Sequence, residues 1–166
     1  MKADDLRAVQ APLKSRYQED PEAARITLSA ESRAGEGVTC SLDTTQGPLT
    51  AGLHPATGGD GMSLCSGDML LEALVACAGV TLNAVATALE IPLREATVRA
   101  EGDLDFRGTL GLAREAPVGF EAIRLQFRLD TDADDEQVAT LLKLTERYCV
   151  VFQTLKQTPE LQVERA

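Results

Sequence analysis

The fold is decided by the stretch Cys65–Pro92, which reads CSGDMLLEALVACAGVTLNAVATALEIP. After Glu72 it carries no charged residue until Glu90, and apolar or small side chains would fall on every face of a helix. A helix that is apolar all round must be buried. A membrane span is the alternative, but the charge-free run is marginal in length and contains threonine and asparagine. The stretch therefore predicts a long core helix.

The sequence also marks the ends of this helix. Ser66 is a suitable N-cap, Asp68 places a negative charge in the first turn, where the helix dipole favours it, and Pro92 stops the run. Such a helix is roughly 35 Å long, which is enough to span a small domain. Cys77 lies near its middle and is its one reactive side chain.

The composition limits the classes of function. A chain of 166 residues with 44% hydrophobic residues fits one soluble globular domain with a real core. The net charge of -10 argues against nucleic acid and anionic membrane surfaces as partners. The first ten residues contain no apolar segment of a secretory signal, so we expect a cytoplasmic protein. The four cysteines are then expected to be reduced thiols.

Residues 1–22 are predicted to form an amphipathic arm ahead of a single α+β domain at residues 23–166. Pro12 is expected to break the helix of this arm or to lie in its first turn. One face of this helix is a stripe of apolar side chains, which needs a surface to pack on, either the chain's own domain or a second subunit. Its apolar residues recur at helical spacing and are Leu6, Val9, Leu13 and Tyr17.

After the arm the hydrophobic period changes to two, which is typical of β-strands. Alternating apolar residues predict strands at residues 25–30 and 38–42, joined by a glycine-rich turn at residues 34–37. A third short strand is expected at residues 49–53. Arg33 lies at the tip of this first hairpin, where an arginine is most often a solvated turn residue.

The second half of the chain predicts two further strands and a second helix. Strands are expected at residues 96–106 and 122–130, and the second has apolar residues at alternate positions. Thr131 or Asp132 would cap a helix with an acidic first turn, and the inner face of that helix continues to Cys149. The apolar residues of that inner face are Val138, Leu141 and Leu142. Together these elements predict an α+β fold.

The loop at residues 54–66, which leads into the core helix, has neither a phosphate-loop lysine nor a dinucleotide fingerprint. His54 is the only histidine, and no Cys-x-x-Cys spacing accompanies it, so we predict no metal and no cofactor. Cys65 is either an ordinary loop cysteine or a third redox thiol, because a helix N-terminus can lower a thiol pKa. Buried cysteines are most often inert, and spacing alone does not say that Cys77 and Cys149 meet.

Two cysteine-containing segments together resemble the OsmC/Ohr family of peroxidases. The first runs from Asp68 to Cys77 as DMLLEALVAC, and the second reads ERYCVV and contains Cys149. In that family a carboxylate opens the central helix ahead of the first cysteine, and a basic residue with tyrosine often precedes the second. The order of elements also matches, from about Arg25 to Glu164. The resemblance implies antiparallel sheets packed around a long buried central helix, in an intertwined homodimer.

The resemblance also implies a reaction. Cys77 would attack an organic hydroperoxide as a thiolate and become a sulfenic acid, and Cys149 would then close a disulfide with it. Arg33 falls where the family carries its active-site arginine, and Asp68 or Glu72 would hold its guanidinium. An external dithiol would reopen the disulfide, and a lipoyl protein is one candidate for it. The protein would then be an enzyme of oxidative-stress defence, acting on organic hydroperoxides rather than hydrogen peroxide.

The sequence departs from the family pattern at two positions. Asp68 is one methylene shorter than the usual glutamate, and Val150 follows Cys149 where several members have proline. The alternative interpretation is a catalytically silent member that binds a small apolar ligand, with both cysteines structural. A count of free thiols before and after addition of a hydroperoxide separates the two interpretations.

Overall fold

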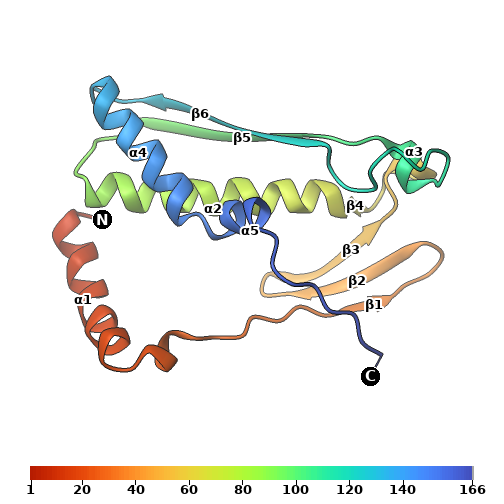
Figure 1. Cartoon of the computed structure of the whole chain (residues 1–166), viewed down its shortest axis with the longest axis horizontal. Helices are drawn as coiled ribbons and strands as arrows, with labels where there is room; N and C mark the ends of the chain where they lie inside the picture. The colour runs from red at the N-terminus through yellow and green to blue at the C-terminus, as the bar shows by residue number, and fades with distance from the viewer. Residues whose placement is uncertain (166) are drawn as a thin grey trace. The chain divides into compact units, whose positions relative to one another are not determined.

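A computed structural model of the chain describes residues 1–165 (Figure 1). The chain forms two compact units that alternate along the sequence. Unit 1 comprises residues 1–15, 73–99 and 126–165, and unit 2 comprises residues 16–72 and 100–125. The boundaries between the units fall inside several helices and strands, so these elements contribute to both units.

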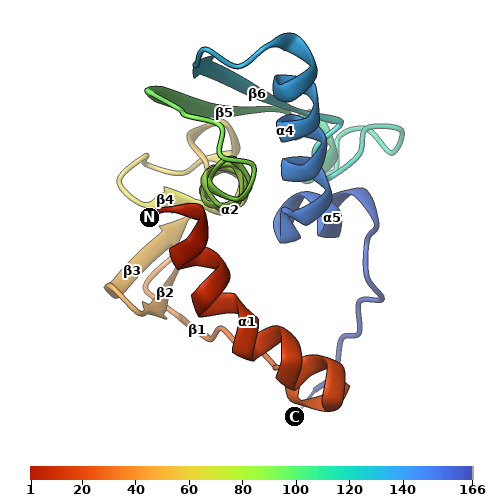
Figure 2. The same ribbon diagram turned by 90° about the vertical axis from the view of Figure 1, so that its left-hand side faces the viewer.

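Unit 1 contains the second half of the long helix that the sequence predicts. That helix is α2 (Ser66–Ala88), and it ends before Pro92. In both views α4 and α5 lie beside it (Figures 1 and 2). The other elements with residues in unit 1 are α1 (Ala3–Glu19), β5 (Glu95–Asp103), β6 (Ala122–Asp130), α4 (Asp135–Tyr148) and α5 (Val150–Lys156).

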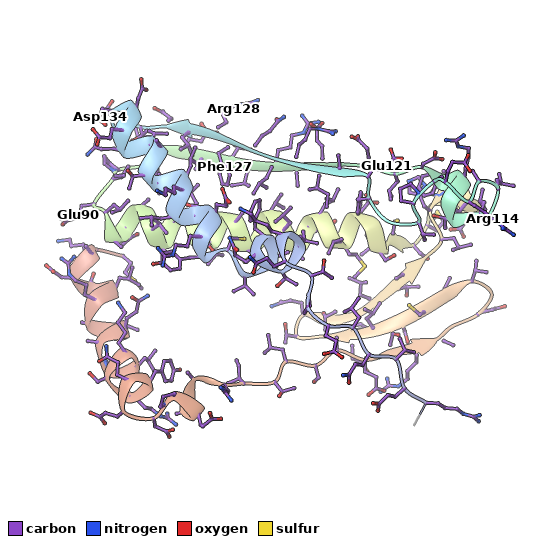
Figure 3. All side chains as sticks on the ribbon, viewed as in Figure 1. Glu90, Arg114, Glu121, Phe127, Arg128 and Asp134 are labelled. Carbon is purple, nitrogen blue, oxygen red and sulfur yellow. The ribbon has the colours of Figure 1, made fainter. Side chains whose placement is uncertain are left out.

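The core of unit 1 forms where α2, α4 and β6 meet. Phe127 and Leu129 of β6 pack against a cluster of buried side chains. Figure 3 shows Phe127 pointing from β6 toward α2, while the neighbouring Arg128 points away. The strand and alternation predicted for residues 122–130 are confirmed, because every second residue of β6 is exposed. The buried cluster consists of Leu82, Val85, Ala86, Ile91 and Leu141.

β5 and β6 form a two-stranded sheet. The N–H of Arg94 donates to the carbonyl of Asp130 at 2.9 Å, and the N–H of Glu121 donates to the carbonyl of Asp103 at 2.9 Å. Because the start of each strand meets the end of the other, the strands are antiparallel. The Arg94 side chain also pairs with the carboxylates of Asp130 and Asp132, but exposed pairs of this kind contribute only about 0–1 kcal/mol.

Unit 2 contains a four-stranded sheet in the order β1-β2-β3-β4. Neighbours among the first three strands are antiparallel, and β4 runs parallel to β3. The turn predicted at residues 34–37 joins β1 to β2, where Gly37 has a φ of 63° that favours glycine. The strands are β1 (Ser32–Ala34), β2 (Thr39–Thr44), β3 (Gly47–Gly52) and β4 (Leu64–Cys65), and the short helices are η1 (Pro21–Ala24), η2 (Pro55–Thr57) and α3 (Phe106–Thr109).

Two predictions for the N-terminal part of the chain are wrong. The strand at residues 25–30 does not form, and Ile26 and Leu28 are 78% and 84% exposed. An alternating apolar pattern forms a strand only where a half-buried surface receives it, and these side chains have none. In addition, α1 continues through Pro12. The carbonyl that Pro12 leaves without an N–H donor lies on an exposed helix, where water can bind it.

The second helix begins later than predicted. Asp134, rather than Thr131 or Asp132, is the N-cap of α4 and forms a capping box with Gln137. The Asp134 carboxylate accepts the N–H of Gln137 at 2.8 Å, and the Gln137 side chain accepts the N–H of Asp134 at 3.1 Å. Thr131 instead donates its hydroxyl to the carbonyl of Pro92 at 2.7 Å, which fixes the loop ahead of the helix.

Removal of the Asp134 cap is expected to destabilise the folded protein. Asp134→Ala should lower the free energy of unfolding by about 1 kcal/mol, because it leaves an N–H group of the first turn without an acceptor. Urea unfolding followed by circular dichroism measures the difference. Asp134→Asn keeps a capping oxygen and should unfold like the wild type. An equal loss in both variants would show that the carboxylate does not act as a cap.

α2 is buried on one side only in the single chain. Val80 is 71% exposed, and Ala73 and Ala76 are also exposed. The prediction of a helix buried all round is therefore not met within one chain, because β6 and α4 cover only part of its surface. The residues on its buried side are Leu74, Ala78, Leu82, Val85 and Ala86.

Candidate active site

Cys77 and Cys149 come together in unit 1. Cys77 lies on α2 and is half-buried, whereas Cys149 follows α4 and is 1% exposed. Leu141 and Thr145 are the buried residues of α4, and Cys149 continues their face at i+4 spacing. Because Leu141 packs in one cluster with α2, this face carries the second thiol to the first. The two thiols are near enough for each to change the pKa of the other.

The chain breaks between α4 and α5 at Cys149. Its backbone is extended, with φ −74° and ψ 107°, so the residue is both the C-cap of α4 and the N-cap of α5. The first N–H groups of a helix have no partner within it. Here the N–H groups of Val150 and Val151 lie near the sulfur of Cys77 and lower the pKa of its thiol. The break therefore directs two backbone donors at the thiol on α2.

The surroundings separate the pKa values of the two thiols. Burial raises the pKa of the Cys77 thiol, but hydrogen bonds outweigh burial and bring the pKa below its ordinary value. The strongest of these bonds comes from the N–H of Val151, followed by those from Cys149, Val150 and Thr81. Burial raises the pKa of Cys149, and its hydrogen bond and charge interaction with Cys77 raise it further. Cys77 therefore ionises first.

This arrangement suits two-electron thiol chemistry. Only a thiolate is a strong nucleophile, and the N–H donors favour the thiolate form of Cys77. A second thiol in contact with it stays protonated and can close a disulfide once the first sulfur is oxidised. The site can thus both attack an electrophilic oxygen and form a disulfide.

The structure places Arg33 in unit 2, on β1, with its side chain 64% exposed. Its guanidinium pairs with the carboxylates of Asp43 at 2.6 Å and Glu31 at 3.2 Å. No ion pair joins Arg33 to Asp68 within residues 1–165, so the predicted clamp of the guanidinium is not formed in the single chain. Cys40, the fourth thiol, lies on β2 opposite Ala34.

Asp68 lines a different feature of unit 2, a cavity of about 370 Å³. Cys65 and His54 also line it, together with the ring of Phe106. His54 accepts the N–H of Ala56 at Nδ1 at 3.0 Å, and its ring stacks on Phe106 with 4.9 Å between centroids. Across residues 1–165, no group of three or more His, Cys, Asp or Glu side chains is placed to hold a metal ion.

The sequence reasoning missed the backbone donors to Cys77. The sequence did not predict that the second helix ends before Cys149, and the family resemblance offered only Arg33 as a cation for the site. Backbone donors cannot be recognised from the residue types in a sequence, because every residue except proline carries an N–H. The available signal was the pair of β-branched residues Val150 and Val151, which weaken a helix at the point where the chain breaks.

A family model described as OsmC-like protein matches residues 58–164, which is more than half of the chain. A search of curated protein sequences finds no match. Solved structures share the fold at low sequence identity. An OsmC-like protein from Mycoplasma pneumoniae is 17% identical, and the match covers 80% of this chain and 89% of that chain with a TM-score of 0.66.

Two organic hydroperoxide resistance proteins are similar in the same way. The one from Legionella pneumophila is 17% identical over 80% of this chain and 93% of that chain, with a TM-score of 0.61. The one from Elizabethkingia anophelis is 14% identical over 81% of this chain and 92% of that chain, with a TM-score of 0.60. Together with the family match, the α+β architecture around a long central helix gives one conclusion: the chain belongs to the OsmC-like family.

Proposed function

We propose that this protein is a cysteine peroxidase that reduces organic hydroperoxides to alcohols in the cytoplasm. The observation that carries the proposal is the neighbouring pair of Cys77 and Cys149, in which the pKa of the first thiol is lowered and that of the second is raised. Two cysteines that only pack in the core would not need pKa values shifted in opposite directions. Membership of a family whose fold is shared with organic hydroperoxide resistance proteins supports the same proposal.

In the first step, the Cys77 thiolate attacks the terminal oxygen of the hydroperoxide. A sulfur–oxygen bond forms while the oxygen–oxygen bond breaks, and Cys77 becomes a sulfenic acid. The departing alkoxide takes up a proton and leaves as an alcohol. The N–H groups of Val150 and Val151 hold the thiolate before the attack. The apolar residues of α2 around the sulfur favour a substrate with an organic tail.

In the second step, the sulfur of Cys149 attacks the sulfur of the Cys77 sulfenic acid. The disulfide forms, and the hydroxyl group leaves as water with the proton of Cys149. Because the thiols already contact each other, this step needs little movement. An external dithiol then reopens the disulfide by exchange and is itself oxidised. The family resemblance makes a lipoyl protein our candidate for that dithiol.

On the basis of the family resemblance, we propose that Arg33 holds the peroxide oxygen beside the Cys77 sulfur and that Asp68 fixes its guanidinium. The pairs that Arg33 forms with Asp43 and Glu31 are exposed, and exposed pairs are worth only about 0–1 kcal/mol. The guanidinium can therefore exchange them for another partner at little cost. Asp68, or Glu72 one turn later, is the proposed partner in the working protein.

We also propose that the protein works as a homodimer. Val80 and Val150 are about 70% exposed, and Tyr148 is 57% exposed, and a second copy of the chain could cover such apolar side chains. Light scattering at micromolar concentration should give twice the mass of one chain. Val80→Glu places a charge on this surface and should shift the mass toward the monomer. A monomeric wild type would contradict the dimer.

Counting thiols tests the peroxidase directly. One equivalent of cumene hydroperoxide should remove two of the four free thiols and release one equivalent of alcohol. Peptide mapping should place the new disulfide between Cys77 and Cys149. If no thiol is lost, the alternative applies, in which the protein is a silent member that binds a small apolar ligand and both cysteines are structural.

A further inference from the structure

The cavity of about 370 Å³ in unit 2 has the size of a site for a small organic molecule. Its lining comes from the loop before α2, the first turns of α2, the end of β5 and the chain around α3. Among residues 1–165, the lining includes neither Cys77 nor Cys149. The cavity is therefore separate from the pair of thiols in unit 1.

One wall of the cavity is a pair of stacked rings. The rings of His54 and Phe106 have centroids 4.9 Å apart and planes 19° apart. The backbone holds both rings in place, because the His54 carbonyl accepts the N–H of Thr57 at 2.8 Å and the Asp105 carboxylate caps the helix that begins at Phe106. This wall needs no rearrangement to receive a ligand.

Phe120 adds a third ring to the lining. It lies against the backbone of Gly102 on β5, where an added Cβ would be only 2.4 Å from the ring. The close approach of ring and strand therefore requires glycine at position 102. Rings in the wall of a cavity favour a ligand with a flat aromatic part, which can stack on their faces or edges.

The charged groups of the lining are acidic. Asp68 is exposed in the first turn of α2, and no hydrogen bond or ion pair engages its carboxylate within residues 1–165. Asp103 differs, because its carboxylate already accepts the guanidinium of Arg124 at 2.9 Å. No lysine or arginine of the described chain lines the cavity. The lining thus offers one unpaired negative charge, which favours a cation.

We propose that this cavity binds a small molecule that combines a flat aromatic ring with a positively charged group. The ring would lie beside the aromatic side chains of the wall, and the charged group would pair with Asp68. The same carboxylate is the proposed partner of Arg33, so a bound molecule would compete with the guanidinium for it. This competition rests on the proposed peroxidase function, whereas the binding does not.

Benzamidinium is the probe for the test, because it is a flat aromatic cation. His54 is the only histidine, so its ring signals in a proton–carbon NMR spectrum report on this cavity. Benzamidinium should shift these signals in a saturable way, with a Kd of about 1 mM. Benzamide has the same ring without the charge and should bind about fivefold more weakly, the value of an exposed ion pair.

Benzoate tests the opposite preference, since N–H groups at the start of a helix attract anions. It should bind more weakly than benzamide, because Asp68 repels it. Tighter binding of benzoate than of benzamidinium, or the absence of a saturable shift with benzamidinium, overturns the proposal.

Gly67→Ala tests whether the probe occupies the cavity. The added Cβ would lie 3.6 Å from the Cys65 sulfur and from the Phe120 ring, which is ordinary contact between lining side chains. The variant should fold normally and bind benzamidinium about tenfold more weakly, since a methyl group takes space from the ligand. Gly119→Ala is the matched control, because its Cβ would meet no atom within 4 Å. Equal affinities in the two variants overturn the assignment to this cavity.

Asp68→Asn tests the charged contact. It should lower the affinity for benzamidinium to that for benzamide, whereas Glu72→Gln, one turn later on α2 and outside the lining, should bind like the wild type. An unchanged affinity in Asp68→Asn overturns the role of the carboxylate. No hydroperoxide is present in these titrations, so failure of the peroxidase proposal and failure of this one are separate results.

Discussion

Cys77→Ser is expected to abolish reduction of cumene hydroperoxide, a fall of about three orders of magnitude or more. A serine hydroxyl in this place stays protonated at neutral pH, so the backbone donors of Val150 and Val151 have no thiolate to hold. The measurement is the rate of alcohol release with a dithiol as reductant. Because the serine side chain is nearly isosteric, the fold should be retained and circular dichroism should be unchanged.

Cys149→Ser gives the complementary result. The first turnover should proceed, one thiol should be lost, and a sulfenic acid should accumulate that dimedone traps on Cys77. Cys40→Ser, on β2 in unit 2, is the control and should react like the wild type. Peroxide consumption by Cys77→Ser at the wild-type rate, or complete inactivity of Cys149→Ser in the first turnover, would contradict the assigned order of the two thiols.

Val150→Pro is expected to raise the pKa of the Cys77 thiol and to slow its alkylation at pH values below that pKa, by up to about tenfold for the loss of one hydrogen bond. Val150 is the first residue of α5, and its N–H donates to Cys77 rather than within the helix. Proline is well tolerated at this position, and the extended backbone of Cys149 suits a residue before proline. The Val150 side chain is 70% exposed in the single chain, so the substitution removes a donor with little loss of packing within that chain.

Two further variants make this result decisive. Val150→Ala keeps the N–H and should titrate like the wild type, which separates the donor from the side chain. Arg33→Gln removes the cation that the family resemblance places in the active site. If Arg33→Gln raises the pKa of Cys77 more than Val150→Pro does, the guanidinium is the main stabiliser. An unchanged titration in Val150→Pro would show that the N–H of Val150 does not act on the sulfur.

The sequence predicted the elements whose side chains carry a strong periodic signal. The long apolar run gave α2, and the strict alternation at residues 122–130 gave β6, because burial on one or all faces leaves a pattern in residue identity. The strand at residues 25–30 failed although its alternation is similar. In the structure these side chains are exposed, and an alternating pattern in the sequence does not show whether another element is present to pack on them.

The candidate site was predictable only in part. Family resemblance paired Cys77 with Cys149, which spacing alone does not do, and the structure brings the two thiols into contact. The donors to Cys77 were not predictable, because they depend on the backbone angles of Cys149 rather than on any side chain. For Arg33, the resemblance implied Asp68 or Glu72 as the partner, whereas in the single chain the guanidinium pairs with Asp43 and Glu31.

The break between α4 and α5 at Cys149 contributes to the site in two ways. The residue supplies the second sulfur, and the next two peptide groups stabilise the first. Local unfolding at Cys149 would therefore leave Cys77 with a higher pKa and without a second thiol for a disulfide. The site would then be inactive although no residue is chemically damaged.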